Sequence, residues 1–381
     1  MAVAISTLDK IKDIVQNRHE YAKDWKARTG RKVLGVFCTY VPEEIAYAAG
    51  LLPVRLLGSH EPQDVTEPYL FGMFCPFSRD VLAQGLKGRY DYLNGIAIAH
   101  TCMHINQSFE SWSLHLPVER SFFVSMPSHV QSPRARPFLA AQLKLFKSQV
   151  EEWTGKTITD EDLDRAIDVY NTSRRLMWDV YNLRKSANPP ITGLETMYVA
   201  LAEQMMDKEE HNQLLRELLE ELKTRKLDRN PGARLMIVGS EDDDTEFLKM
   251  VENVGATIVV DDHCTGTRYF WNEVECIGDN RLESLANRYL DRSPCPNRDW
   301  PVRRRFPLIH QLAKDFGVQG VIIIQQKFCD PHEADIPALT AYLKKGGIPT
   351  LFLEFDVTVP VGQFRIRVEA FLETIGQEDL F

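Results

Sequence analysis

The stretch that decides the fold runs from Lys32 to Leu57 and reads KVLGVFCTYVPEEIAYAAGLLPVRLL. Its first six residues are an apolar run that predicts a buried strand. The Pro-Glu-Glu at 42–44 predicts the start of a helix that ends at Gly50, and the last six residues predict a second strand. We expect a helix over 78–86 and a third strand at 94–99. Strands that alternate with helices predict a parallel sheet, whose functional groups lie in loops at the carboxyl ends of the strands.

The pattern changes after this unit. From 137 to about 226 the apolar residues follow helical spacing, and Thr159 with Asp162 three residues later is typical of a helix start. Asn-Pro-Gly-Ala at 230–233 breaks the chain and opens a second α/β unit. Its expected strands are 234–240, 256–261, 320–325 and 349–355, with helices over 243–254 and 335–346. We therefore predict an α/β protein with two Rossmann-like parallel-sheet domains (1–136, which includes an N-terminal helix, and 231–381) and a helical block between them (137–230).

Composition narrows the functional class. The 381 residues carry 45 Lys and Arg against 54 Asp and Glu, so the formal charge is 45 − 54 = −9. This balance argues against a broad nucleic-acid surface and favours small molecules or proteins as partners. Charges within the first dozen residues and the absence of a long apolar run predict a cytoplasmic, soluble chain with no membrane span.

Three cysteines stand out among seven. Cys75, Cys102 and Cys329 each follow an apolar segment and precede Pro, Met-His or Asp, which suits loops at the rim of a sheet. No compact CxxC motif is present, and burial as ordinary core residues is an equal alternative for each. If the three thiols converge between the α/β units, they could hold a cubane iron–sulfur cluster by three irons and leave the fourth open. A zinc site that uses His104 remains an alternative.

The other cysteines carry weaker signals. Cys264 precedes Thr-Gly and could supply a fourth thiolate. Cys38 faces the start of a helix, which would lower its pKa, although packing is its expected role. We interpret Cys276 and Cys295 as structural. The three arginines at 303–305 are expected to form a solvated face, with contact to an acidic partner or a nucleotide phosphate as the alternative.

Several nucleotide and hydrolase motifs are missing. The sequence contains no GxxxxGK[ST], no GxGxxG after a strand and no GxSxG. This chain alone is therefore not expected to hydrolyse ATP or to bind a dinucleotide.

Several long motifs, in order, resemble the family of 2-hydroxyacyl-CoA dehydratase and benzoyl-CoA reductase cluster-bearing subunits. They are FCTYVPEEIAYAAGLLPVRL (37–56), CPFSRD (75–80), DDHCTGTRY (261–269), KFCDPH (327–332) and PTLFLEFDVTVPVGQFRIRVEAF (349–371). The resemblance runs from about residue 30 to the C-terminus. The stretches CPFSRDVLAQGLKGRYDY (75–92) and SMPSHVQS (125–132) resemble the benzoyl-CoA reductase branch more than the dehydratases.

The resemblance implies one subunit of an oxygen-sensitive, ATP-dependent benzoyl-CoA reductase that converts benzoyl-CoA to a cyclic dienoyl-CoA by low-potential single-electron transfer. It implies that Cys75, Cys102 and Cys329 bind a [4Fe-4S] cluster. The implied partners are a homologous second cluster-bearing subunit and separate ATP-hydrolysing activator subunits, with an aromatic acyl-CoA as substrate.

The sequence indicates the proton donors and the residues that would bind the substrate less clearly than it indicates the cluster ligands. We expect His104 and Glu44 to donate protons near the cluster, because His is a versatile acid at neutral pH. For Glu44 the alternative is a carboxylate in the first turn of a helix, where the helix dipole favours it. Arg365 and Arg367 could hold a CoA phosphate or pair with acidic surface groups.

Three other functions stay open. A 2-hydroxyacyl-CoA dehydratase subunit would use the same cluster to form a ketyl radical and eliminate water. A double-cubane reductase homodimer would need further cysteine ligands, of which Cys264 could be one. A non-catalytic partner would hold the cluster and contact substrate only through its neighbour.

Overall fold

Two parallel sheets form the frame of the protein. The computed structural model describes residues 5–357 and 359–378. Within them the first sheet has the strand order β2-β1-β3-β4 and the second has β6-β5-β7-β8. All the strand pairs of these two sheets are parallel. The strands are β1 (Val33–Val36), β2 (Leu52–Arg55), β3 (Gly95–Ala99), β4 (Arg120–Val124), β5 (Ala233–Gly239), β6 (Ala256–Asp262), β7 (Gly320–Gln326) and β8 (Thr350–Phe355). The prediction of an α/β fold with two parallel-sheet units is confirmed.

The two sheets repeat one topology. In each, the strand order reverses between the first and third strand of the unit, which are β1 and β3 in one sheet and β5 and β7 in the other. Open α/β sheets bind ligands at the carboxyl ends of the strands beside such a reversal. The loops after these four strands are therefore where a site is expected.

The inner strands are buried on both faces because helices cover both sides of each sheet. The inner strands β1, β3 and β7 are buried along their whole length, and β7 reads GVIIIQQ. Near-continuous apolar runs of this kind are typical of parallel sheets. The edge strand β4 differs, since only Phe122 and Val124 of its five side chains are buried. The sequence pattern did not predict β4.

Helices connect the strands in both units. In the first unit they are α1 (Thr7–Gln16), α2 (Arg18–Thr29), α3 (Glu43–Ala48), α4 (Pro76–Leu86) and α5 (Met103–His115). In the second they are α10 (Thr245–Asn253), α11 (Thr267–Phe270), α12 (Arg281–Asp291), α13 (Arg305–Asp315), α14 (Asp330–Glu333), α15 (Ile336–Lys345) and α16 (Val361–Glu378). Three single 3₁₀ turns are η1 (Asp64–Thr66), η2 (Leu183–Lys185) and η3 (Pro296–Arg298). Of the helices in the described residues, none has both the length and the apolar character to cross a membrane.

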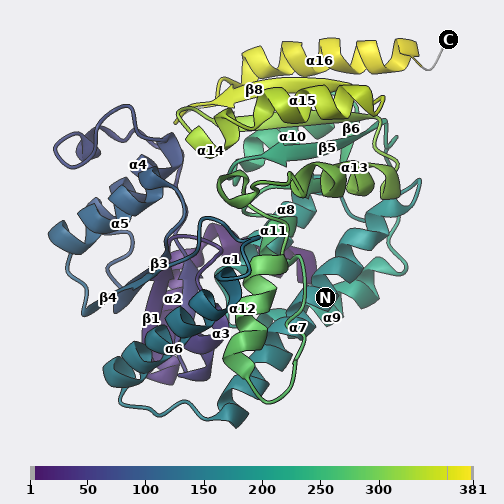
Figure 1. Ribbon diagram of the computed structural model, residues 1–381. Coiled ribbons are helices and arrows are strands. Elements are labelled where there is room, and N and C mark those ends of the chain that lie inside the picture. The colour runs from purple at the N-terminus through teal and green to yellow at the C-terminus, as the bar shows by residue number, and fades with distance from the viewer. Residues whose placement is uncertain (1–4, 358, 379–381) are drawn as a thin grey trace.

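Four helices form the block between the sheets: α6 (Ala135–Thr154), α7 (Asp160–Asn182), α8 (Gly193–Glu203) and α9 (Lys208–Leu222). The helix start predicted at Thr159 is confirmed, because Thr159 Oγ1 accepts from the Asp162 N–H and Asp162 Oδ2 accepts from the Thr159 N–H. Figure 1 shows α12 lying along α6, and α1 packs on α8. The packing therefore crosses the domain limits that we predict from the sequence, and those limits stay a prediction.

Candidate functional site: a cavity lined by cysteines

Six of the seven cysteines line one cavity at the carboxyl ends of both sheets. They are Cys38, Cys75, Cys102, Cys264, Cys295 and Cys329. Cys38 follows β1, Cys102 follows β3 and Cys329 follows β7, while Ser240 and Glu241, which also line the cavity, follow β5. The cavity thus lies where the strand order of both sheets reverses, and the two α/β units share it.

Cys75, Cys102 and Cys329, here called the first trio, have a common local setting. Each is the residue directly before a helix, namely α4, α5 and α14. Main-chain N–H groups at a helix start favour negative charge, so this setting suits a thiolate. The sequence prediction that these three thiols would converge on a crevice between the units agrees with their place in the cavity.

Burial keeps the free thiols of the first trio protonated. It raises the pKa of Cys75 to about 12 against the opposing effect of the Ser78 and Phe77 N–H groups. Burial also raises the pKa of Cys329, and the neighbouring Cys75 and Cys102 sulfurs raise it further. The pKa of Cys102 is raised by burial in the same way. A bound metal reverses this effect on the pKa, because a coordinating thiol is deprotonated outright.

Buried arginines add positive charge around the cavity. Arg55, Arg268 and Arg292 line it and are each at most 3% exposed. Arg292 donates to Thr39 O, and Arg268 donates to Gly239 O. Among the described residues, however, the buried Nε and Nη1 atoms of Arg55 have no acceptor. Buried donors without partners are costly, so an anionic group in the cavity would satisfy Arg55.

A single zinc ion does not match the arrangement. Ligating sulfurs around one zinc ion lie roughly 3.8 Å apart, as Zn–S bonds of about 2.3 Å require. In the described part of the chain no three His, Cys, Asp or Glu side chains close around one ion. The described residues therefore do not support the alternative of a single zinc ion that uses His104.

His104 lies in the cavity and positions the loop of Cys75. Its Nδ1 accepts from the Cys75 N–H at 3.0 Å, and its Nε2 lies 3.5 Å from Asp330 Oδ2. Burial lowers the pKa of His104, although Asp330 opposes the shift. A neutral ring with its proton on Nε2 therefore joins the Cys75 loop of the first unit to the residue after Cys329 in the second.

Glu44 lies outside the cavity lining. It is fully buried on α3, where its carboxylate pairs with Arg174 of α7 and accepts from Tyr289 Oη at 2.8 Å. Burial would raise the pKa of Glu44, but the Arg174 and Arg288 guanidinium groups outweigh it and hold the pKa below its usual value. The structure thus places Glu44 as an ion-pair carboxylate, and nothing in its surroundings supports a role as proton donor.

The structure buries one of the arginines expected at the surface, and it places the two expected at a CoA phosphate on the C-terminal helix. The expectation of a solvated face at 303–305 is wrong for Arg305, which is 1% exposed and pairs with Asp262 and Asp335 at 2.7 Å each. Arg365 and Arg367 lie on α16, away from the cavity lining, where Arg365 pairs with Glu369.

Some residues of the site carry little or no signal in the sequence. Cys295, interpreted as structural, lines the cavity, whereas Cys276 is exposed outside it. Glu241 and Arg55 were not predicted as site residues. A signal for Glu241 was available, because it follows a predicted strand at a sheet's carboxyl end just as Cys38 does.

The 2-hydroxyglutaryl-CoA dehydratase D-component family matches residues 38–375 of the sequence. The chain belongs to this family. The resemblance that the motifs indicate is therefore confirmed. Similar proteins match more than nine-tenths of the chain. The chain is 30% identical to the (R)-phenyllactyl-CoA dehydratase beta subunit of Clostridium sporogenes over 365 residues, which is 96% of this chain and 97% of the relative.

Two more relatives carry names for different reactions. A benzoyl-CoA reductase subunit of Thauera aromatica is 28% identical over 92% of both chains. The beta subunit of the (R)-2-hydroxyglutaryl-CoA dehydratase of Acidaminococcus fermentans is 27% identical over 91% of this chain and 93% of the relative. Membership therefore identifies an enzyme of the dehydratase and reductase kind, and the names of the relatives divide between dehydration and reduction.

Proposed function

We propose that this chain is the [4Fe-4S]-bearing subunit of an ATP-dependent benzoyl-CoA reductase, and that Cys75, Cys102 and Cys329 hold its cluster. The observation that carries the proposal is that these three thiols, far apart in sequence, line one cavity at the strand reversals of two sheets. The reductase branch is supported by the stretches 75–92 and 125–132 and by the likeness to the benzoyl-CoA reductase of Thauera aromatica.

The residues of the cavity suit an anionic iron–sulfur cluster. Three thiols at helix starts would become thiolate ligands, and the unpartnered N–H groups of Arg55 would face the negative charge. When bound, the cluster would supply single electrons at low potential. The chain itself contributes burial, since most lining residues are closed off from solvent. Excluding water protects reactive intermediates from side reactions.

A partner subunit would cover an apolar rim beside the first trio. Phe71, Met73, Met103 and Phe328 lie within four residues of Cys75, Cys102 or Cys329, and all four are exposed, from 37% for Phe328 to 75% for Phe71. Apolar side chains exposed beside a functional site are typical of a surface that another protein covers. A homologous cluster-bearing subunit would fit here, and the missing GxxxxGK[ST] motif means that separate subunits would hydrolyse ATP.

Separate incubations with the two candidate substrates test the proposed reaction. The purified complex is incubated without oxygen with ATP, a reductant and either benzoyl-CoA or a 2-hydroxyacyl-CoA, and the products are identified by mass spectrometry. We expect a cyclic dienoyl-CoA from benzoyl-CoA and no dehydration of the hydroxyacyl thioester. Dehydration without dearomatisation would instead place the chain with the dehydratases.

A double-cubane reductase is the second candidate, and one observation favours it. Cys38, Cys264 and Cys295, here called the second trio, line the same cavity as the first trio. Burial alone would lower the pKa of the Arg268 guanidinium, but Cys264, Asp262 and Cys295 outweigh burial and raise it. The chain thus offers six thiols where one cubane with an open iron needs three.

Iron content separates the two candidates. For the benzoyl-CoA reductase subunit we expect about four iron atoms per chain, and Cys264→Ala and Cys295→Ala should keep them. About eight iron atoms per chain, halved in these two variants, would support the double-cubane protein. The measurement is iron and acid-labile sulfide per chain after anaerobic purification, with Cys276→Ala as the control because Cys276 is exposed outside the cavity.

A further inference from the structure

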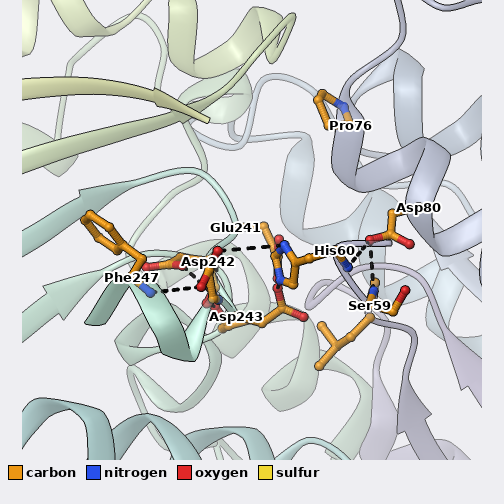
Figure 2. Close-up of polar contacts among 12 residues, drawn as sticks. Ser59, His60, Pro76, Asp80, Glu241, Asp242, Asp243 and Phe247 are labelled. Carbon is orange, nitrogen blue, oxygen red and sulfur yellow. Dashed lines mark hydrogen bonds and ion pairs between the residues drawn. The ribbon is translucent and has the colours of Figure 1, made fainter. Parts of the chain in front are cut away.

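An acidic loop separates the cysteine cavity from a smaller cavity beside it. The loop follows β5 and reads Glu-Asp-Asp-Asp at 241–244. Glu241 lines both cavities, as do Phe77 and Gln326. Figure 2 shows the acidic loop on one side of His60 and Asp80 on the other. Glu241 therefore stands at a boundary, with the cysteine cavity on one side and a second group of titratable residues on the other.

Glu241 is a buried carboxyl group without a full set of partners. It is 5% exposed, and within the described residues its Oε1 atom has no hydrogen-bond partner. Burial raises the pKa of Glu241 well above its usual value, and Asp243 and Asp242 raise it further, while Arg55 opposes them. These effects favour the protonated form of Glu241, which suits a group that gives a proton away.

The smaller cavity holds groups that can return a proton. It is lined by His60, Asp80 and Asp243 and reaches Asp356, which is half exposed. His60 Nε2 lies 2.7 Å from Asp243 Oδ1. Although burial opposes it, Asp243 raises the pKa of His60 to about 10. His60 is one-third exposed, so this charged pair connects solvent with the far side of Glu241.

Other polar groups of the cysteine cavity are less suited to proton donation. His104 accepts from the Cys75 N–H at Nδ1, and the proton on its Nε2 faces Asp330 at 3.5 Å. Asp330, the other carboxyl in the lining, is 64% exposed and lies 3.5 Å from His104 Nε2. Among the described residues that line the cavity, Glu241 is the buried carboxyl.

We propose that Glu241 is the proton donor of the reaction in the cysteine cavity. This inference rests on the proposed function, in which the ATP-hydrolysing component supplies two electrons and the ring gains two protons. In one transfer, the O–H bond of Glu241 breaks, its proton forms a C–H bond with the ring that has accepted an electron, and the electron pair stays on the carboxylate. The carboxylate then takes a proton from solvent through the cavity lined by His60 and Asp243.

The test compares Glu241→Gln with Asp242→Asn in the whole complex. Asp242 is a matched control, because it is 1% exposed in the same loop, its pKa is raised by burial, and it lines neither cavity. We expect Glu241→Gln to keep wild-type iron and sulfide and to lose turnover by on the order of 10²-fold or more, which is typical for a lost general acid. Asp242→Asn should stay within about threefold of wild type, because removing an acid that faces neither cavity takes no donor from the site.

Infrared spectroscopy gives a readout that does not depend on activity. In difference spectra of the full chain in H₂O and D₂O, the carbonyl band of a protonated carboxyl should be lost in Glu241→Gln. If that variant does not fold, Glu241→Asp decides, since it keeps the acid and shortens its reach. We expect it to show a shifted band and reduced turnover at unchanged iron content.

The outcomes separate this inference from the proposed function. Full turnover of iron-loaded Glu241→Gln, or of Glu241→Asp with an unshifted band, would overturn the role of Glu241 while the reductase proposal stands. A wild-type complex that reduces no benzoyl-CoA would overturn the proposed function, and the infrared band would still report whether Glu241 carries a proton.

Discussion

Alanine at Cys75, Cys102 or Cys329 is expected to remove most of the iron and acid-labile sulfide from the chain and to abolish turnover. A cubane held by three thiolates loses a third of its protein ligands with each substitution. The three positions lie in loops from both α/β units, so no remaining pair of the first trio preserves the site. The measurement is iron and sulfide per chain, together with the visible absorption of the cluster, after anaerobic purification.

The control for this experiment is Cys276→Ala. Cys276 is exposed and lines neither the cysteine cavity nor its neighbour, so its removal should leave iron content unchanged. Retention of full iron in all three first-trio variants would contradict the ligand assignment. Loss of iron in Cys264→Ala as well would indicate a fourth thiolate ligand.

The convergence of the first trio could be predicted because strand ends carry positional information. Carboxyl ends of parallel strands meet at one edge of a sheet, and Cys102 and Cys329 each follow a predicted strand by a few residues. What the sequence could not show was how the two sheets face each other. The six thiols share one cavity only because the strand reversals of both sheets point to a common crevice.

The features that the sequence analysis did not predict correctly have physical causes. The edge strand β4 was not predicted, because only alternate residues of RSFFV are buried and the strand lacks the continuous apolar run of its neighbours. The prediction for Arg305 fails because charged residues are mostly exposed, whereas here two buried carboxylates compensate the charge. Such pairings join residues 30 to 43 positions apart, which periodicity along the chain does not reveal.

Glu44 is another residue whose tertiary partners the sequence does not reveal. It gives the second prediction with a large expected effect. Its spacing after Pro42 places it in the first turn of α3, as the sequence predicts. The tertiary structure adds Arg174 from α7 and Tyr289 from α12, so one carboxylate joins three segments far apart in the chain. A donor role near the cluster was a reasonable expectation from sequence, but the structure shows a carboxylate held in place by buried partners.

Glu44→Gln is expected to lower the free energy of unfolding by about 3–5 kcal/mol, because it leaves the Arg174 guanidinium buried without its counter-ion. Glu209→Gln is the matched control. Glu209 pairs with Arg165 at the surface, where both side chains are more than half exposed, so its loss should cost about 0–1 kcal/mol. Urea unfolding of the full chain, followed by circular dichroism, measures both differences.

The pH dependence of this loss identifies its electrostatic origin. The pKa of folded Glu44 lies below the ordinary value of 4.5, because Arg174 and Arg288 outweigh burial. The stability from its charged form is therefore complete above about pH 5 and is lost as the pH falls through the folded pKa. The gap between wild type and Glu44→Gln should be constant near neutral pH and shrink in acid. A gap that stays the same down to about pH 3 would mean that Glu44 stabilises the fold by packing, with the ion pair contributing nothing measurable.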